Sequence, residues 1–124
     1  MAVFQGNGTR LESMEAARKA ADVASDKQAS DVVLLDLRIL AAFTDFFVIC
    51  SADSARQISA IVRAIDEVLG PQGHNLRHKV GADSSGWVLM DYGDIIIHVF
   101  SSAARDFYDL EAAWANAHQV VRIQ

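Results

Sequence analysis

The sequence predicts one α/β domain in which helices cover a mixed β-sheet. Three observations indicate this class: short apolar runs typical of buried strands, amphipathic stretches between them, and a hairpin that leads directly into a last helix. A chain of 124 residues, 52% hydrophobic and 22% charged, is long enough to bury one core. We expect parallel pairing where a helix crosses over the sheet and antiparallel pairing at the hairpin.

The N-terminal half contains one helix and two strands. Residues 1–9 hold little that would order them, so we expect a disordered end followed by a single domain over residues 10–124. Alanines recur at helical spacing from about Arg10 to Lys27, which predicts a first helix. Residues 31–37 and 45–51 are rich in Val, Ile, Leu and Phe and predict two adjacent central strands, buried on both faces.

The second helix has clear end signals. Ser54 followed by Gln57 fits a capping box, an apolar stripe continues from there, and Gly70 with Pro71 ends the helix. The segment Gln72 to Ser85 is rich in Gly, Asn, Asp and Ser, which predicts a loop with a weak edge strand.

A β-hairpin is predicted from Trp87 to Phe100. With Tyr92 and Gly93 as its loop, Asp91 faces Asp94; with Gly93 and Asp94 as its loop, Leu89 faces His98. Both registers place the same set on one face: Trp87, Leu89, Asp91, Asp94, Ile96, His98 and Phe100. Because the opposite face is almost purely apolar, we expect that face to be core and the polar-bearing one to be a binding surface.

Two further elements complete the predicted fold. A third helix begins near Ser101 or Ser102 and aligns Phe107, Leu110 and Trp114 in one stripe, leaving Tyr108 and Glu111 on one shoulder. Residues 118–123 then predict a last strand.

The net charge of -5 argues against nucleic acid as a direct, sequence-specific ligand, since phosphate binding draws on clustered Lys and Arg. The one basic cluster, Arg77-His78-Lys79, is short. A basic protein is the better partner for an acidic surface. The single cysteine, Cys50, lies in an apolar run, so we expect it to be buried and inert. No apolar run reaches the roughly 18 to 20 residues that cross a membrane, so we expect a cytoplasmic protein.

Three segments resemble the ribosomal silencing factor family, also called the Iojap-like family. They are Trp87 to Phe100 (WVLMDYGDIIIHVF), Ala104 to Glu111 (ARDFYDLE) with the closing Trp114, and Thr44 to Ser51 (TDFFVICS). The resemblance spans roughly Ala16 to Trp114, and this combination of segments is highly specific.

The resemblance implies a small non-enzymatic factor with a nucleotidyltransferase-like fold, often a homodimer. Its members dock on the fourteenth large-subunit ribosomal protein, a basic protein at the intersubunit face. There they hinder joining of the small subunit and lower translation during starvation, and a role in large-subunit biogenesis is also attached to them.

Eight residues are the expected partner-binding set: Trp87, Asp91, Tyr92, Asp94, His98, Arg105, Tyr108 and Glu111. Aromatic anchors and complementary charges dominate many interfaces. Four of the eight also have a structural alternative. Asp91 and Asp94 also suit a turn, His98 a satisfied core position, and Arg105 a weak ion pair on the helix surface. Trp114 we expect in the core.

The rival hypothesis is a metal-dependent nucleotidyltransferase with Asp91 and Asp94 as Mg²⁺ ligands. The chain has no Gly-rich phosphate loop with a following Lys, and His74 and His78 lack a nearby third ligand for zinc. We therefore expect no catalysis, no metal and no cofactor.

Overall fold

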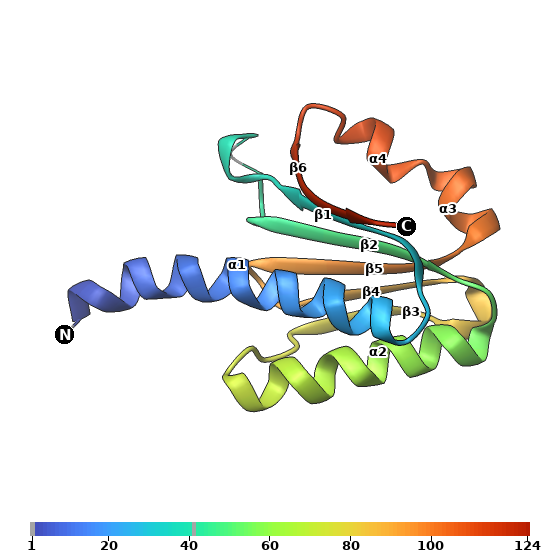
Figure 1. Ribbon diagram of the computed structural model, residues 1–124, viewed down its shortest axis with the longest axis horizontal. Helices are drawn as coiled ribbons and strands as arrows, with labels where there is room; N and C mark the ends of the chain where they lie inside the picture. The colour runs from blue at the N-terminus through green and yellow to red at the C-terminus, as the bar shows by residue number, and fades with distance from the viewer. Residues whose placement is uncertain (1, 41) are drawn as a thin grey trace.

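The computed structural model describes residues 2–40 and 42–124, and the side chains of residues 13–40 and 42–124. It is a single α/β domain with a six-stranded sheet between helices (Figure 1). Three 3-10 turns, at 38–40, 70–72 and 83–85, join some of the elements. The helices and strands follow in the order α1 (Ala2–Asp26), β1 (Ser30–Asp36), β2 (Phe46–Ala52), α2 (Ala55–Leu69), β3 (His78–Ala82), β4 (Trp87–Asp91), β5 (Ile95–Ser101), α3 (Ser102–Tyr108), α4 (Leu110–Ala113) and β6 (His118–Ile123).

The sheet is mixed, as predicted. Its strand order is β3-β4-β5-β2-β1-β6, and only β2 and β5 run parallel. The chain passes through α2 between those two strands, so this helix belongs to the crossover. Every residue of β2 is buried, which confirms the central strand with two covered faces. The weak edge strand and the last strand, β3 and β6, form the two edges.

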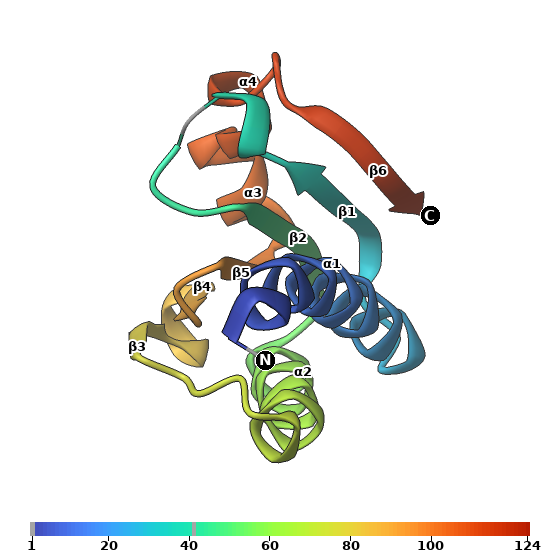
Figure 2. The ribbon, with the colours of Figure 1, turned by 90° about the vertical axis from the view of Figure 1, so that its left-hand side faces the viewer.

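Helices α1 and α2 pack side by side on one face of the sheet (Figure 2). On α1 the buried stripe is made of alanines, with Ala17, Ala20 and Ala24 fully buried, so the helix backbone approaches the sheet closely. On α2 the stripe is made of larger residues: Ile58, Ile61, Val62, Ile65 and Leu69. The predicted cap is confirmed, because the Ser54 hydroxyl accepts a hydrogen bond from the Gln57 amide at 3.1 Å.

The start of α1 differs from the predicted start near Arg10. The helix begins at Ala2 and continues through Gly6 and Gly8, whose low helix propensity favoured the later start. Met1 lies outside the described residues. Neither α1 nor any other helix of residues 2–40 and 42–124 is both long and apolar enough to cross a membrane.

The hairpin adopts the second of the two predicted registers. The Tyr92 amide donates to the Ile95 carbonyl at 2.9 Å, and Leu89 pairs with His98. Gly93 has a φ of 90°, the left-handed conformation that a tight loop needs and that glycine adopts without a steric penalty. Asp91 therefore pairs with Ile96, and the register in which it faces Asp94 is wrong.

The prediction of one continuous third helix is also wrong, because the helix is interrupted at Asp109. This residue has a φ of 45°, and its amide donates to the Arg105 carbonyl, which ends α3 before the short α4 begins. The break removes Phe107 from the predicted apolar stripe and leaves it 81% exposed. Trp114 remains half-buried and packs edge-on against Phe47.

A second apolar cluster lies on the face of the sheet opposite α1 and α2. Helices α3 and α4 are on this side, near β5, β2 and β1 (Figure 2). The cluster is built from Val33, Leu35, Leu37, Phe47, Ile49, Ile96 and Phe100. The polar-bearing hairpin face is thus partly core, and only its remainder is available to a partner.

Candidate functional site

The sheet face beyond α3 and α4 stays uncovered over β3 and β4. Helix α3 packs over β5 and β2, and beside it the sheet face remains open to solvent. Residues paired across neighbouring strands share a face, so Val80 lies beside Leu89, and Trp87 lies beside Phe100. Five residues define what we term the open face: Val80, Trp87, Leu89, Phe107 and Tyr108.

The open face is rich in large apolar side chains that solvent reaches. Val80 is 59% exposed, Tyr108 52% and Phe107 81%, while Trp87 and Leu89 are half-buried. The Trp87 ring packs against Phe100 at 5.1 Å and Tyr108 at 4.6 Å between ring centroids, and Tyr108 contacts Phe107 at 5.1 Å. Such rings offer rigid contact area at little entropic cost, as in many protein interfaces.

His98 lies beneath the open face and is core. Its side chain is 3% exposed, so His98 occupies the core position that the sequence offered as its structural alternative. Its ring meets Phe47 edge-on at 4.8 Å and stacks on Phe100 at 5.9 Å. The Trp87 indole Nε1 donates to its Nδ1 at 3.3 Å. Burial penalises the charged imidazolium and lowers the pKa of His98 from 6.5 to about 4.

The hairpin turn, at the opposite end of β4 from Trp87, is held by bonds within the protein. Asp91 Oδ1 accepts from the Gly93 amide at 2.7 Å, and Asp94 Oδ2 accepts from the Ser13 hydroxyl at 3.0 Å. The Tyr92 hydroxyl donates to Asp66 at 2.8 Å, and burial raises the pKa of this tyrosine. Asp91 is thus a turn former, Tyr92 is buried, and Asp94 alone has an exposed side chain.

Arg105 is buried, which contradicts the weak surface ion pair that was its structural alternative. The guanidinium is 8% exposed; Nη1 donates to the Asp31 carbonyl at 2.6 Å and to Ser51 Oγ at 3.0 Å, and Nε donates to Glu111 at 2.8 Å. Nη2 lies 3.4 Å from Asp31 Oδ2 but lacks hydrogen-bond geometry there. These contacts tie α3 to β1, β2 and α4.

Arg122 of β6 extends the same network. It pairs with Asp31 at 2.6 Å and with Glu111 at 3.3 Å, so two arginines alternate with two carboxylates. The hydrogen bond from Arg105 is the main cause that lowers the pKa of Glu111. Arg105 and Glu111 therefore hold the α3-α4 segment and β6 together, a structural role that the sequence did not reveal.

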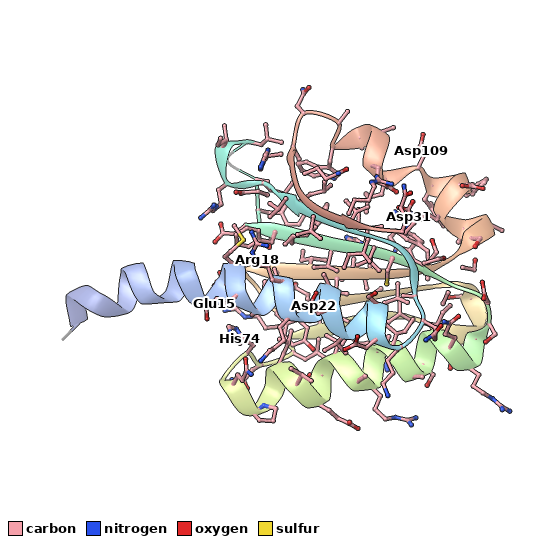
Figure 3. The ribbon with its side chains drawn as sticks, viewed as in Figure 1. Glu15, Arg18, Asp22, Asp31, His74 and Asp109 are labelled. Atoms are coloured by element: carbon pink, nitrogen blue, oxygen red, sulfur yellow. The ribbon has the colours of Figure 1, made fainter. Side chains whose placement is uncertain are left out.

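A cavity lies beside this network and not at the open face. It measures about 550 Å³ and is lined by Ser30, Asp31, Ser51, Ser102, Arg105, Asp106, Asp109 and Glu111. Figure 3 shows Asp31 and Asp109 at this end of the molecule. Four carboxylates against one arginine favour a cation over an anion. The described residues nevertheless contain no group of three or more His, Cys, Asp or Glu side chains placed to hold a metal.

Cys50 and a second cavity lie apart from the open face. Cys50 is buried as predicted, and desolvation raises the pKa of its thiol to about 12, so the reactive thiolate is disfavoured. A cavity of about 370 Å³ between α1 and the end of α2 is lined by Glu15, Ala16, Lys19, Gln72 and His74. Figure 3 labels Glu15 and His74 at this place, and Arg18 and Asp22 follow along α1.

The eight predicted residues therefore separate into four places. Trp87 and Tyr108 lie on the open face, and His98 lies beneath it. Asp91, Tyr92 and Asp94 form the distant turn, and Arg105 and Glu111 belong to the ion-pair network.

The sequence missed two residues of the open face. The sequence predicts a loop with a weak edge strand around Val80, and the alternation of Val80 with the exposed Lys79 is the signal for its place on this face. For Phe107 the sequence predicts a position in an apolar stripe, and the helix break at Asp109 that exposes it has no signal as clear as a glycine.

Comparisons with known proteins agree on one family. A family model described as "Ribosomal silencing factor during starvation" matches residues 10–124. The chain is 37% identical to ribosomal silencing factor RsfS of Bacillus subtilis over 98 residues, which cover 79% of this chain and 83% of that protein. It is 34% identical to RsfS of Halalkalibacterium halodurans over 110 residues, with 89% and 94% covered.

A solved structure gives the same result for the fold. The crystal structure of a protein from Chromobacterium violaceum superposes with a TM-score of 0.77 at 31% identity, and the match covers 82% of this chain and 85% of the other.

Proposed function

Because the chain belongs to the ribosomal silencing factor family, we propose that it binds the large ribosomal subunit through its open face and blocks joining of the small subunit. The partner is a basic protein at the intersubunit face, the fourteenth of the large subunit, and the factor acts in the cytoplasm. Repression then follows from occupancy of a surface and requires no chemical step.

The observation that carries this proposal is the open face itself. Large exposed apolar side chains rarely gather on a monomer without a binding role. Here Phe107, Tyr108 and Val80 are exposed, Tyr108 packs against the Trp87 indole, and the rings of Phe100 and His98 pack against the same indole. An aromatic anchor on a rigid base is typical of the centre of an interface.

Acidic residues at α3 fit a basic partner. Asp106 and Asp109 flank the two exposed aromatic residues of α3 in the sequence, and both are exposed at the rim of the cavity beside the ion-pair network. The protein as a whole carries a net charge of -5. Complementary charge steers the encounter between two proteins and penalises partners of the same sign.

The proposal is tested by sedimentation of mixed ribosomal subunits with an excess of the protein. We expect fewer joined ribosomes and a shift of the protein into the large-subunit fractions. Joined ribosomes at the level of the protein-free sample, with the protein at saturation, would refute the blocking role.

Charge reversal with a matched control tests the partner chemistry. Asp106→Lys places a cation on α3 next to Phe107 in the sequence, whereas Asp22→Lys makes the same change in net charge on the exposed side of α1. We expect Asp106→Lys to weaken large-subunit binding about tenfold and Asp22→Lys to leave it nearly unchanged. Equal effects would mean that net charge, and not this surface, governs binding.

We also propose that the protein has no nucleotidyltransferase activity. Asp91 and Asp94 accept hydrogen bonds from Gly93 and Ser13, so each carboxylate already has a structural partner. Incubation with Mg²⁺ and each nucleoside triphosphate should give no transfer or hydrolysis above background. Turnover that disappears in both Asp91→Asn and Asp94→Asn would establish the enzyme instead.

A further inference from the structure

We propose that His98 is a positioning residue for the open face: its ring holds the Trp87 indole in the orientation that a partner meets. The inference rests on the proposed function of that face. His98 itself does not touch a partner, since its side chain is 3% exposed. It acts through one hydrogen bond to a side chain that does reach the surface.

The bond runs diagonally across the two strands of the hairpin. Trp87 pairs with Phe100 and Leu89 pairs with His98, so Trp87 and His98 are diagonal neighbours on the same face. The indole Nε1 donates to His98 Nδ1 at 3.3 Å. Within the described residues this is the hydrogen bond of the Trp87 side chain, and it fixes the rotation of the ring in its plane.

The acceptor is itself immobile. Phe47 meets the imidazole edge-on at 4.8 Å with an interplanar angle of 80°, and Phe100 stacks on it at 5.9 Å with an angle of 7°. Both phenylalanines are at most 2% exposed, so the imidazole is held by the core. The indole in turn packs against both Phe100 and Tyr108. A rigid chain of contacts thus leads from the core to the exposed surface.

Accepting this hydrogen bond through Nδ1 destabilises the protein, and packing of the ring in the core does not explain why a histidine is here. For Nδ1 to accept, the ring must be neutral and carry its proton on Nε2. Nε2 is buried and has no hydrogen-bond partner among the described residues. A buried donor without a partner destabilises a protein, and a phenylalanine here would fill the space without that penalty. If His98 only filled the core, a phenylalanine would therefore stabilise the protein more. The polar ring is accounted for if it orients Trp87.

Two substitutions separate orientation from stability. His98→Phe keeps an aromatic ring of similar size and removes the acceptor. His98→Asn places its Oδ1 where Nδ1 was, which keeps an acceptor, but it leaves a cavity in the core. We expect the urea midpoint to stay or rise in His98→Phe and to fall in His98→Asn. Large-subunit binding should rank the other way, with about a fivefold loss in His98→Phe and near-normal binding in His98→Asn.

The indole N–H resonance of Trp87 reports the bond directly in the free protein. The chain has two tryptophans, so the resonance of Trp114 serves as the internal control. We expect the Trp87 resonance to shift in His98→Phe and to stay near its original position in His98→Asn, while that of Trp114 stays fixed in both. An unmoved Trp87 resonance in His98→Phe overturns the inference.

Binding of the isolated large subunit distinguishes this inference from the function on which it rests. If Tyr108→Ala weakens binding but His98→Phe does not, the open face stands and the positioning role is overturned. If neither Tyr108→Ala nor Trp87→Ala weakens binding, the open face is not the interface, and the positioning role falls with it. In a Trp87→Phe background, His98→Phe should add no further loss, because the donor is already gone.

Discussion

The two faces of the sheet are built from different side chains. Toward α1 and α2 the sheet presents aliphatic residues such as Val48, Ile95 and Ile97, which pack against alanines of α1 and isoleucines of α2. Toward α3 and α4 it presents Phe47, Phe100 and His98, with Trp87 at the margin. The long helices α1 and α2 cover the first face, whereas the short helices α3 and α4 leave part of the second face open.

Under the proposed function, this difference associates stability with one face and recognition with the other. Aliphatic packing under long helices buries surface without polar groups, which stabilises the fold. Two buried side chains, His98 and Arg105, lie on the side of the sheet toward α3 and α4. Each leaves a nitrogen without a hydrogen-bond partner among the described residues. Polar groups of this kind fix geometry at the expense of stability.

The largest effect we predict is on the aliphatic face. Ile97→Ala removes a fully buried side chain of β5 and should lower the free energy of unfolding by about 3 kcal/mol. Leu89→Ala, on the half-buried open face, should lower it by about 1 kcal/mol. Urea denaturation of both variants measures the contrast. Equal losses would mean that the open face is as much a part of the core as the helix-covered face.

The second effect is a dependence of stability on pH that comes from His98. Its pKa is about 4 in the folded protein and 6.5 in the unfolded chain, so between these values only the unfolded chain binds the proton. Stability should therefore fall as the pH is lowered from about 6.5 to about 4, by up to about 3 kcal/mol.

His98→Phe isolates that contribution. Asp36 and Glu111 also have lowered pKa values, so they too lose stabilisation as the pH falls, but in a more acidic range. Urea midpoints across this pH range should decline less steeply in His98→Phe than in the unsubstituted protein. The same slope in both would mean that His98 does not titrate as its burial requires.

Substitution of Arg105 should produce a somewhat smaller loss of stability. Arg105→Met keeps an unbranched side chain but leaves Asp31 and Glu111 with Arg122 alone, and we expect about 2 kcal/mol of destabilisation. The two acids remain partly exposed, so water relieves part of the loss. Thermal unfolding measures it. Stability within about 0.5 kcal/mol of the original would show the weak surface pair that the sequence suggested.

The smallest effect on stability belongs to the exposed aromatic residues. Phe107→Ala should change the free energy of unfolding by less than about 0.5 kcal/mol, because the side chain is 81% exposed. The affinity of the Phe107→Ala variant for the large subunit should nevertheless fall. Phe43→Ala, another exposed phenylalanine at 72%, provides the matched control, since Phe43 precedes β2 and lies outside the open face. A larger loss of affinity in Phe43→Ala would move the interface to that loop.

Periodicity and caps predicted the elements well, because those signals are local. The Ser54 cap, the α2 stripe and the Gly93 loop each depend on neighbouring residues, and the structure confirms them. The division of the hairpin into two faces also followed from alternation alone.

Burial of the polar residues was harder to predict, because it depends on contacts across long sequence separations. Arg105 bonds to Asp31 and Ser51, which come from strands far earlier in the chain. His98 is buried because Phe47 and Phe100 enclose it. The exposure of Phe107 depends on the left-handed backbone conformation of a single residue, Asp109. The identity of that residue alone does not predict this conformation.

Hydrogen exchange of the protein, alone and with saturating large ribosomal subunits, tests the central claim most directly. The claim is that the open face meets the subunit and the helix-covered face does not. We predict slower amide exchange in β3, β4 and α3 on binding, with the exchange of α2 unchanged. Protection of α2, with β3, β4 and α3 exchanging as in the free protein, would contradict the account.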